Sequence, residues 1–192
     1  MSEGVVQSLT TANLWWLPDI QYEPKQRAIG CIRNALTGFD GVHHRLLAIA
    51  SLYCCLVEKE VLECWHLYSF CSVPSTVIDR FSLPDKMAHF LKQLNNSTVC
   101  EKIEREDTVY ACIMTAQAPP PVADHNVICL CIPRTLPFVF VHVLAKNVTF
   151  RNCLQRAFGR PIKDLQAGQP VGDLGKAIVK ARQMYKDRAA QA

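Results

Sequence analysis

Residues 108–132 read TVYACIMTAQAPPPVADHNVICLCI, and this stretch decides the fold class. Residues 108–116 and 127–132 are rich in β-branched, aromatic and cysteine side chains, a composition that favours strands. Residues 117–126 hold three consecutive prolines, which cannot easily join a hydrogen-bonded ladder and must loop out. The stretch therefore predicts a β-hairpin, and a further strand is expected at residues 138–144.

Helix-type patterns flank this hairpin. Residues 25–37 place apolar side chains on one helix face, and residues 42–57 are apolar almost all round, as in a buried central helix. The other expected elements are a strand at residues 61–73 and helices at residues 83–94, 150–158 and 174–190. Because strands and helices interleave without regular βαβ alternation, we expect an α+β fold. It would contain a mostly antiparallel sheet packed with helices, plus a C-terminal basic helix.

The composition indicates a folded chain. Of 192 residues, 49% are hydrophobic and 20% are charged, which excludes a mostly disordered protein. We expect a flexible N-terminal arm at residues 1–24 and an α+β core at residues 25–165. A linker marked by Gly168 and Pro170, followed by the basic helix, would occupy residues 166–192.

The ten cysteines raise the question of disulfides and metals. No apolar run reaches the ~20 residues of a membrane span, and no secretory signal is visible, so we expect a reducing compartment and free thiols. The chain has no C-x-x-C pair, so we expect no metal and no cofactor. A zinc site stays open among a group of neighbouring ligand-type residues: Cys54, Cys55, Cys64, His66 and Cys71.

Charge is concentrated at the C-terminal end. Residues 1–145 carry 11 basic and 14 acidic side chains, whereas residues 146–192 carry 10 basic and 3 acidic ones. The final helix could dock through a face formed by Leu174, Ile178, Ala181 and Tyr185, with its cations merely solvated. Alternatively, it is a basic amphipathic helix that binds an anionic membrane or RNA. The candidate residues for binding a membrane or RNA are Lys176, Lys180, Arg182, Lys186 and Arg188.

Aromatic residues gather in the N-terminal arm. Trp15, Trp16, Pro18 and Tyr22 lie between polar and proline-containing segments and follow no helical or strand period. They could anchor the arm on the folded body, or they could form a short motif that binds a partner, because Trp and Tyr favour both cores and interfaces. Both interpretations stay open from sequence.

No catalytic motif is found. The sequence has no glycine-rich phosphate loop, no G-x-S-x-G and no H-E-x-x-H. Glu101, Glu104, Glu106 and Asp107 are most simply a solvated charged turn between strands. We therefore expect no catalytic residues and no enzyme activity. A cysteine-dependent enzyme is the alternative, and one thiol with a pKa far below ~8.5 would support it.

Several short segments resemble rhabdovirus matrix proteins. Residues 16–24, WLPDIQYEP, resemble the W-L-P-P-P-E-Y-V-P arm of the lyssavirus branch. Residues 31–40, CIRNALTGFD, resemble that family's I-L-R-H-I-L-R-S-F-D helix, and residues 65–68, WHLY, fall where the family has a W-V-Y-K-L strand. Phe150-Arg151 with residues 157–159 is similar to the F-R-x-x-A-L-x-F-G helix of the vesiculovirus branch. The segments occur in the family's order along the chain.

The resemblance implies a structural viral matrix protein with an α+β core. Such proteins self-associate, condense and bridge ribonucleoprotein to the inner face of the membrane, and promote virion assembly and budding. The implied partners are the protein itself, viral nucleoprotein–RNA, anionic membrane lipids, and host budding or nuclear export factors. The implied locations are the virion beneath its envelope, the host cytoplasm and the inner face of host membranes, and the nucleus.

Two features depart from the family's pattern. The P-P-x-Y motif that recruits WW domains is replaced by residues 19–22, DIQY, which lose the polyproline geometry. The first cation of the chain is Lys25, so the basic N-terminal arm of the vesiculovirus branch is missing. The basic helix at residues 174–190 is expected to take over that electrostatic role. The alternative function is a soluble RNA-binding viral accessory protein that acts against host gene expression or defence.

Overall fold

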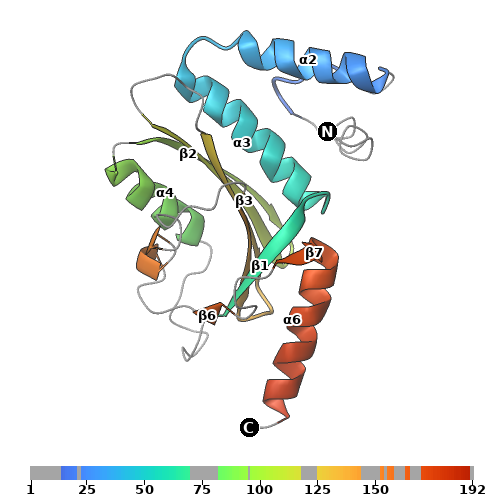
Figure 1. Cartoon of the computed structure of the whole chain (residues 1–192), viewed down its shortest axis with the longest axis vertical. Helices are drawn as coiled ribbons and strands as arrows, with labels where there is room; N and C mark the ends of the chain where they lie inside the picture. Colours follow the sequence, from blue (N-terminus) through green and yellow to red (C-terminus); the bar gives the residue numbers. More distant parts are fainter. Residues whose placement is uncertain are drawn as a thin grey trace.

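A computed structural model describes residues 14–20, 23–69, 82–94, 96–117, 125–143, 152–153, 155–157, 163–164 and 170–190. Within these ranges the helices are α2 (Lys25–Thr37), α3 (Val42–Glu58), α4 (Leu83–Gln93) and α6 (Leu174–Ala189). The strands are β1 (Glu63–Ser69), β2 (Asn96–Arg105), β3 (Thr108–Gln117), β4 (His125–Pro133), β5 (Phe138–Val143), β6 (Lys163–Asp164) and β7 (Val171–Asp173). The α+β class, the antiparallel sheet and the C-terminal helix are confirmed (Figure 1).

All paired strands are antiparallel. The sheet has the order β2-β3-β4-β5-β1-β6, and β7 pairs with the first half of β1. The expected hairpin forms its centre, where Cys112 on β3 lies opposite Cys129 on β4. The continuous apolar character of β3, β4 and β5 follows from burial on both faces of the sheet.

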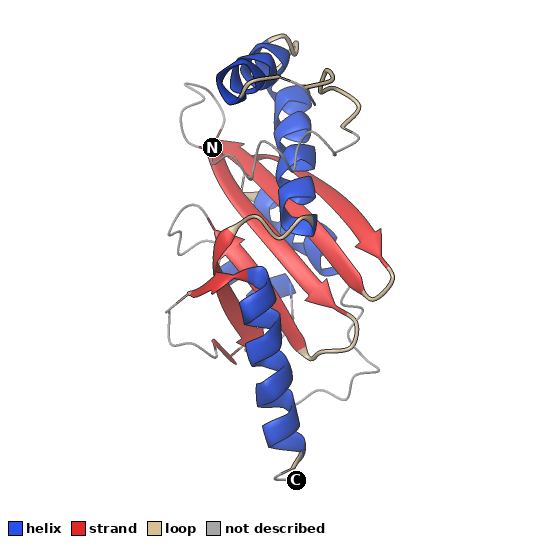
Figure 2. Ribbon diagram, turned by 90° about the vertical axis from the view of Figure 1, so that its right-hand side faces the viewer, coloured by secondary structure: helices blue, strands red, loops and turns tan. Residues whose placement is uncertain are grey.

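Two cores lie on opposite faces of the sheet. On one face, α3 and α6 pack against Trp65, Phe138 and Phe140. On the other face, α4 packs against a core that includes Val139 and Val141. Successive residues of β5 therefore point to opposite faces, as the strand period requires. Figure 2 shows α3 and α6 in front of the sheet. Each fully buried large apolar side chain contributes ~1.5–3 kcal/mol.

The helix boundaries follow local rules. Pro84 lies in the first turn of α4, where no backbone N–H donor is needed. Gly41 precedes α3 with a φ of 87°, a conformation that glycine adopts without strain. Residues 152–153 and 155–157 are helical, in agreement with the helix expected at 150–158.

Two predictions were wrong about strands. The charged segment that includes Glu101 and Glu104 is part of β2 rather than a turn, and only residues 106–107 turn. β2 lies at an edge of the sheet, where charged side chains remain accessible to water. The expected linker also contains β7, which pairs with β1. In the described part of the chain, no helix combines the length and hydropathy of a membrane span.

Candidate anion-binding surface on the C-terminal helix

The start of α6 is fixed to the sheet. Strand β7 pairs with β1, placing Asp173 opposite Glu63 and Val171 opposite Trp65. Asp173 Oδ1 then accepts a hydrogen bond of 2.7 Å from the backbone N–H of Lys176, and so caps the start of the helix. The orientation of α6 is therefore set by strand pairing followed directly by a capped first turn.

The first half of α6 docks through small and apolar residues. Leu174, Ala177 and Ala181 are fully buried, and Ile178 and Met184 are partly buried against the same core. The small alanines allow the helix backbone to approach the sheet closely. This arrangement supports the docked-helix interpretation for the N-terminal part of α6.

Tyr185 does not belong to the docked face, contrary to the prediction. Its side chain is 46% exposed although it lies on the same side of the helix as Leu174 and Ala181. The reason is that the end of α6 extends beyond the sheet (Figures 1 and 2). Helical period alone could not reveal where the sheet beneath the helix ends.

The outward face of α6 carries the predicted cations. Lys176, Lys180, Arg182 and Lys186 are all exposed, and we call these four residues the basic face. The backbone of Arg188 belongs to α6, but its side chain is outside the described set. Four of the five cations predicted from sequence therefore lie on one exposed surface of the helix.

Among the described residues, only Lys176 of the basic face has an ion-pair partner. Lys176 Nζ lies 2.8 Å from Asp173 Oδ2, and their hydrogen bond lowers the pKa of the Asp173 carboxyl and raises that of the lysine. Lys180, Arg182 and Lys186 form no ion pair with any described residue. Asp187 instead accepts a hydrogen bond of 2.7 Å from Gln183. Three cations are thus available to an external anion.

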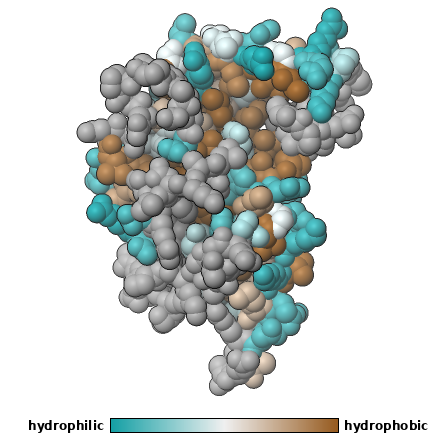
Figure 3. All heavy atoms as spheres, in the orientation of Figure 1, coloured by the Kyte–Doolittle hydropathy of each residue, from teal (hydrophilic) through white to brown (hydrophobic). Residues whose placement is uncertain are grey.

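An apolar residue lies within the basic face. Val179 is 65% exposed. The helical period places Lys176 and Lys180 on one side of it and Arg182 and Lys186 on the other. In the space-filling view, hydrophilic and hydrophobic residues alternate along α6 (Figure 3). The surface therefore combines positive charge with an apolar contact.

The two tryptophans of the arm have different surroundings. Trp16 is half-buried, and its Nε1–H donates a hydrogen bond of 2.8 Å to Ser51 Oγ on α3. Trp15 is 67% exposed and touches Phe39 edge-on, with ring centroids 5.7 Å apart. Pro18 is exposed, and Tyr22 lies outside the described residues. Trp16 therefore serves as an anchor, whereas Trp15 faces outward.

The cysteines do not form a metal centre in the described part of the chain. There, no group of three or more His, Cys, Asp or Glu side chains could hold a metal ion. Cys54 and Cys55 are buried in α3, whereas Cys64 is exposed and His66 half-buried on β1. Cys71 falls outside the described residues.

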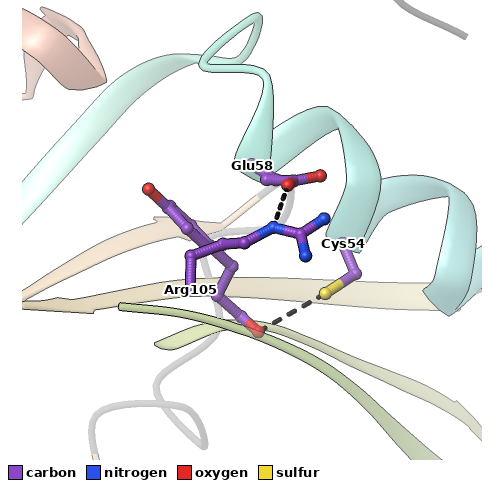
Figure 4. A network of polar contacts seen from close by, with 4 residues as sticks. Cys54, Glu58 and Arg105 are labelled. Atoms are coloured by element: carbon purple, nitrogen blue, oxygen red, sulfur yellow. Dashed lines mark hydrogen bonds and ion pairs between the residues drawn. The ribbon is translucent and has the colours of Figure 1, made fainter. Parts of the chain in front are cut away.

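The buried thiols are also poor candidates for a nucleophile. Cys54 Sγ donates to the backbone carbonyl of Tyr110 at 3.4 Å, close to the ion pair of Glu58 and Arg105 (Figure 4). Burial raises the pKa of Cys54, and it raises that of Cys100 to about 12. A reactive cysteine needs the opposite shift, because the thiolate is the nucleophile.

A buried histidine lies at the junction of β1 and β5. His142 Nδ1 is 2.6 Å from the backbone oxygen of Glu63, and its ring centroid lies 5.7 Å from that of Trp65. His142 Nε2 is buried and has no hydrogen-bond partner among the described residues. Burial lowers the pKa of this histidine. Sequence reasoning did not single it out, because nothing in the strand pattern marks it.

Comparison with known proteins adds no family assignment. Neither protein-family models nor curated protein sequences match this chain. The likeness to rhabdovirus matrix proteins therefore rests on the short segments quoted above.

Proposed function

We propose that this chain is a non-enzymatic structural protein of the viral matrix type, which binds an anionic membrane surface through the basic face of α6. The main support is that Lys180, Arg182 and Lys186 are exposed and form no ion pair with a described residue, on a helix that is held to the sheet. The order of the matrix-like segments along the chain supports the matrix type. Bridging to ribonucleoprotein and a role in budding belong to the same proposal.

The electrostatic binding free energy expected from these cations is suitable for reversible membrane binding. Each Lys or Arg near an anionic bilayer contributes ~1 kcal/mol, so three free cations contribute roughly 3 kcal/mol, which is about two orders of magnitude in affinity. Val179 adds an apolar contact that can enter the headgroup region. Because the first half of the helix is already docked, only the end of α6 needs additional ordering on binding.

RNA is the second candidate partner. The same cations could neutralise phosphates, and binding would then fall steeply with salt. Tyr185 is the one aromatic residue of α6, so stacking of single-stranded bases has little support. The exposed Val179 between the cations favours an interface with an apolar layer. The membrane is therefore the preferred partner.

Flotation with phosphatidylserine-containing vesicles at low and high salt tests the proposal. We expect the wild-type chain to float at low salt, less at high salt, and not with neutral vesicles. The triple variant Lys180→Glu, Arg182→Glu, Lys186→Glu should lose flotation. These side chains are exposed and form no ion pair within the described part of the chain, so the variant should remain folded.

A matched control carries the same change in charge elsewhere. Lys25, Arg33 and Lys59 are exposed on other parts of the molecule, and their replacement by Glu should leave flotation largely intact. Equal loss in both triple variants would mean that net charge, rather than α6, governs binding. Salt-dependent binding of single-stranded RNA without flotation would favour the RNA-binding alternative.

A further inference from the structure

The two edges of the sheet differ in whether their backbone groups pair with a further strand. The outer side of β1 pairs with β6 and β7. At the other edge, β2 pairs with β3 along its whole length and with no other described strand (Figure 1). No backbone hydrogen bond connects the outer side of residues 99–105 to another described residue. Such a row of free N–H and C=O groups can accept a further strand.

On the α3 side of the sheet, β2 presents Glu101, Ile103 and Arg105. Ile103 packs against the core beneath α3, and Arg105 pairs with Glu58 on α3 while remaining 63% exposed. Glu101 has no ion pair or hydrogen bond with any described residue, although burial raises the pKa of its carboxyl. A partly buried carboxylate without a counter-charge is unfavourable, and a neighbouring cation would stabilise it.

On the α4 side of the sheet, β2 presents Lys102 and Glu104. Lys102 lies 2.7 Å from Asp85 on α4, and Glu104 lies 3.5 Å from Arg134. Glu104 is 56% exposed, so it can accept a further cation. Each face of β2 therefore carries one acidic and one basic side chain. The two are four residues apart on the α3 side and two residues apart on the α4 side.

We propose that β2 pairs with β2 of a second copy of this chain, antiparallel, about a two-fold axis at Ile103. In this register, Glu101 lies opposite Arg105 of the second copy on the α3 side. Lys102 lies opposite Glu104 of the second copy on the α4 side. The axis repeats both contacts, so the interface contains four opposite-charge cross-strand pairs around Ile103. Symmetric dimers use the same patch on both subunits in this way.

The charge pattern selects this register among those that a two-fold axis allows. An axis at Glu101, Lys102 or Glu104 places two identical charges opposite each other, which is destabilising. An axis at Cys100 forms no opposite-charge pair along β2. Only the axis at Ile103 pairs every charge of residues 101–105 with an opposite one. Glu101 then gains a counter-charge that the described residues of its own chain do not supply.

This interface deepens the self-association part of the proposed function and does not depend on lipid. The test is sedimentation velocity of the full chain across a range of concentrations. We expect a concentration-dependent dimer. Glu101→Lys and Arg105→Glu should each raise its dissociation constant by at least about tenfold, because each turns two attractive pairs into repulsive ones.

Mixing the two variants gives the sharpest result. In a dimer of one Glu101→Lys chain and one Arg105→Glu chain, both pairs on the α3 side are again opposite in charge. The mixture should therefore regain a dimer that neither variant forms alone. Failure of the mixture to dimerise would overturn the register.

Controls keep folding and membrane binding separate. Glu63→Lys makes the same charge change on β1, at the opposite edge, and should leave the dimer intact. Thermal melting checks that Arg105→Glu still folds without its Glu58 pair. Glu101→Lys should still float with anionic vesicles, so this result and that of the α6 variant are distinguishable. A wild-type chain that stays monomeric at about 100 µM, or an unaffected Glu101→Lys dimer, would overturn the proposal.

Discussion

At the scale of the residue, neighbours in the chain have different roles. Trp16 donates to Ser51 Oγ and packs with Ile20, Ile32 and Leu52, whereas the adjacent Trp15 is mostly exposed. The sequence placed both tryptophans in one candidate motif, because no periodicity distinguishes them. Only the position of α3 beneath the arm separates an anchor from an outward-facing side chain.

This difference predicts unequal effects on stability. Trp16→Phe should lower the free energy of unfolding by about 1 kcal/mol, because Ser51 Oγ loses its indole donor. Trp15→Phe should change it by less than about 0.5 kcal/mol, as is usual for exposed positions. Urea unfolding of the two variants beside the wild type measures both values. Equal destabilisation would show that the arm is not anchored through Trp16.

His142 makes stability depend on pH. Burial lowers its pKa in the folded chain below the ordinary value of 6.5, so the unfolded chain takes up the proton first as pH falls. Its contribution to stability is therefore present above pH ~6.5 and is lost as pH falls through the folded-state pKa. Urea unfolding at pH 7.5, 6.5 and 5.5 should show decreasing stability. His142→Gln, which does not titrate, should show a smaller decrease, and an equal decrease would contradict the assignment.

At the scale of the element, patterns predicted the buried segments better than the edges. α3 and the β3–β4 hairpin were expected because their apolar residues are continuous and the prolines between the strands exclude a longer ladder. β2 was missed because Glu101, Lys102, Glu104 and Arg105 interrupt its apolar residues, and such interruptions are also typical of loops. β7 was missed because its three residues follow Pro170 and include Gly172, and so short a segment carries no strand period.

Docking of α6 predicts the effect of enlarging its small residues. Ala177 and Ala181 are fully buried between the helix and the sheet. Ala181→Leu should lower the free energy of unfolding by ~1–3 kcal/mol, because the added atoms have no space. Ala190→Leu, beyond the end of α6 and exposed, is the matched control and should change stability by less than about 0.5 kcal/mol. A neutral Ala181→Leu would mean that α6 is not packed on the sheet.

At the scale of the whole molecule, the two proposed binding surfaces lie at opposite edges of the sheet. The basic face lies on α6, which packs over β1, while the open strand β2 lies at the opposite edge of the sheet. The sequence located the basic segment from its excess of Lys and Arg. It could not reveal which cations are free, because the pairing of Lys176 with Asp173 depends on the capped turn. A dimer through β2 would leave the basic face of both copies accessible.

The most direct test of the central claim is hydrogen exchange of the full chain with and without anionic vesicles, followed by peptide mass spectrometry. The end of α6 extends beyond the sheet, so its amides should exchange readily in the free chain (Figure 1). We predict that vesicles slow exchange in peptides covering residues 179–187, and that high salt reverses the effect. Vesicle binding that protects other segments, and leaves residues 179–187 unchanged, would contradict a membrane site on α6.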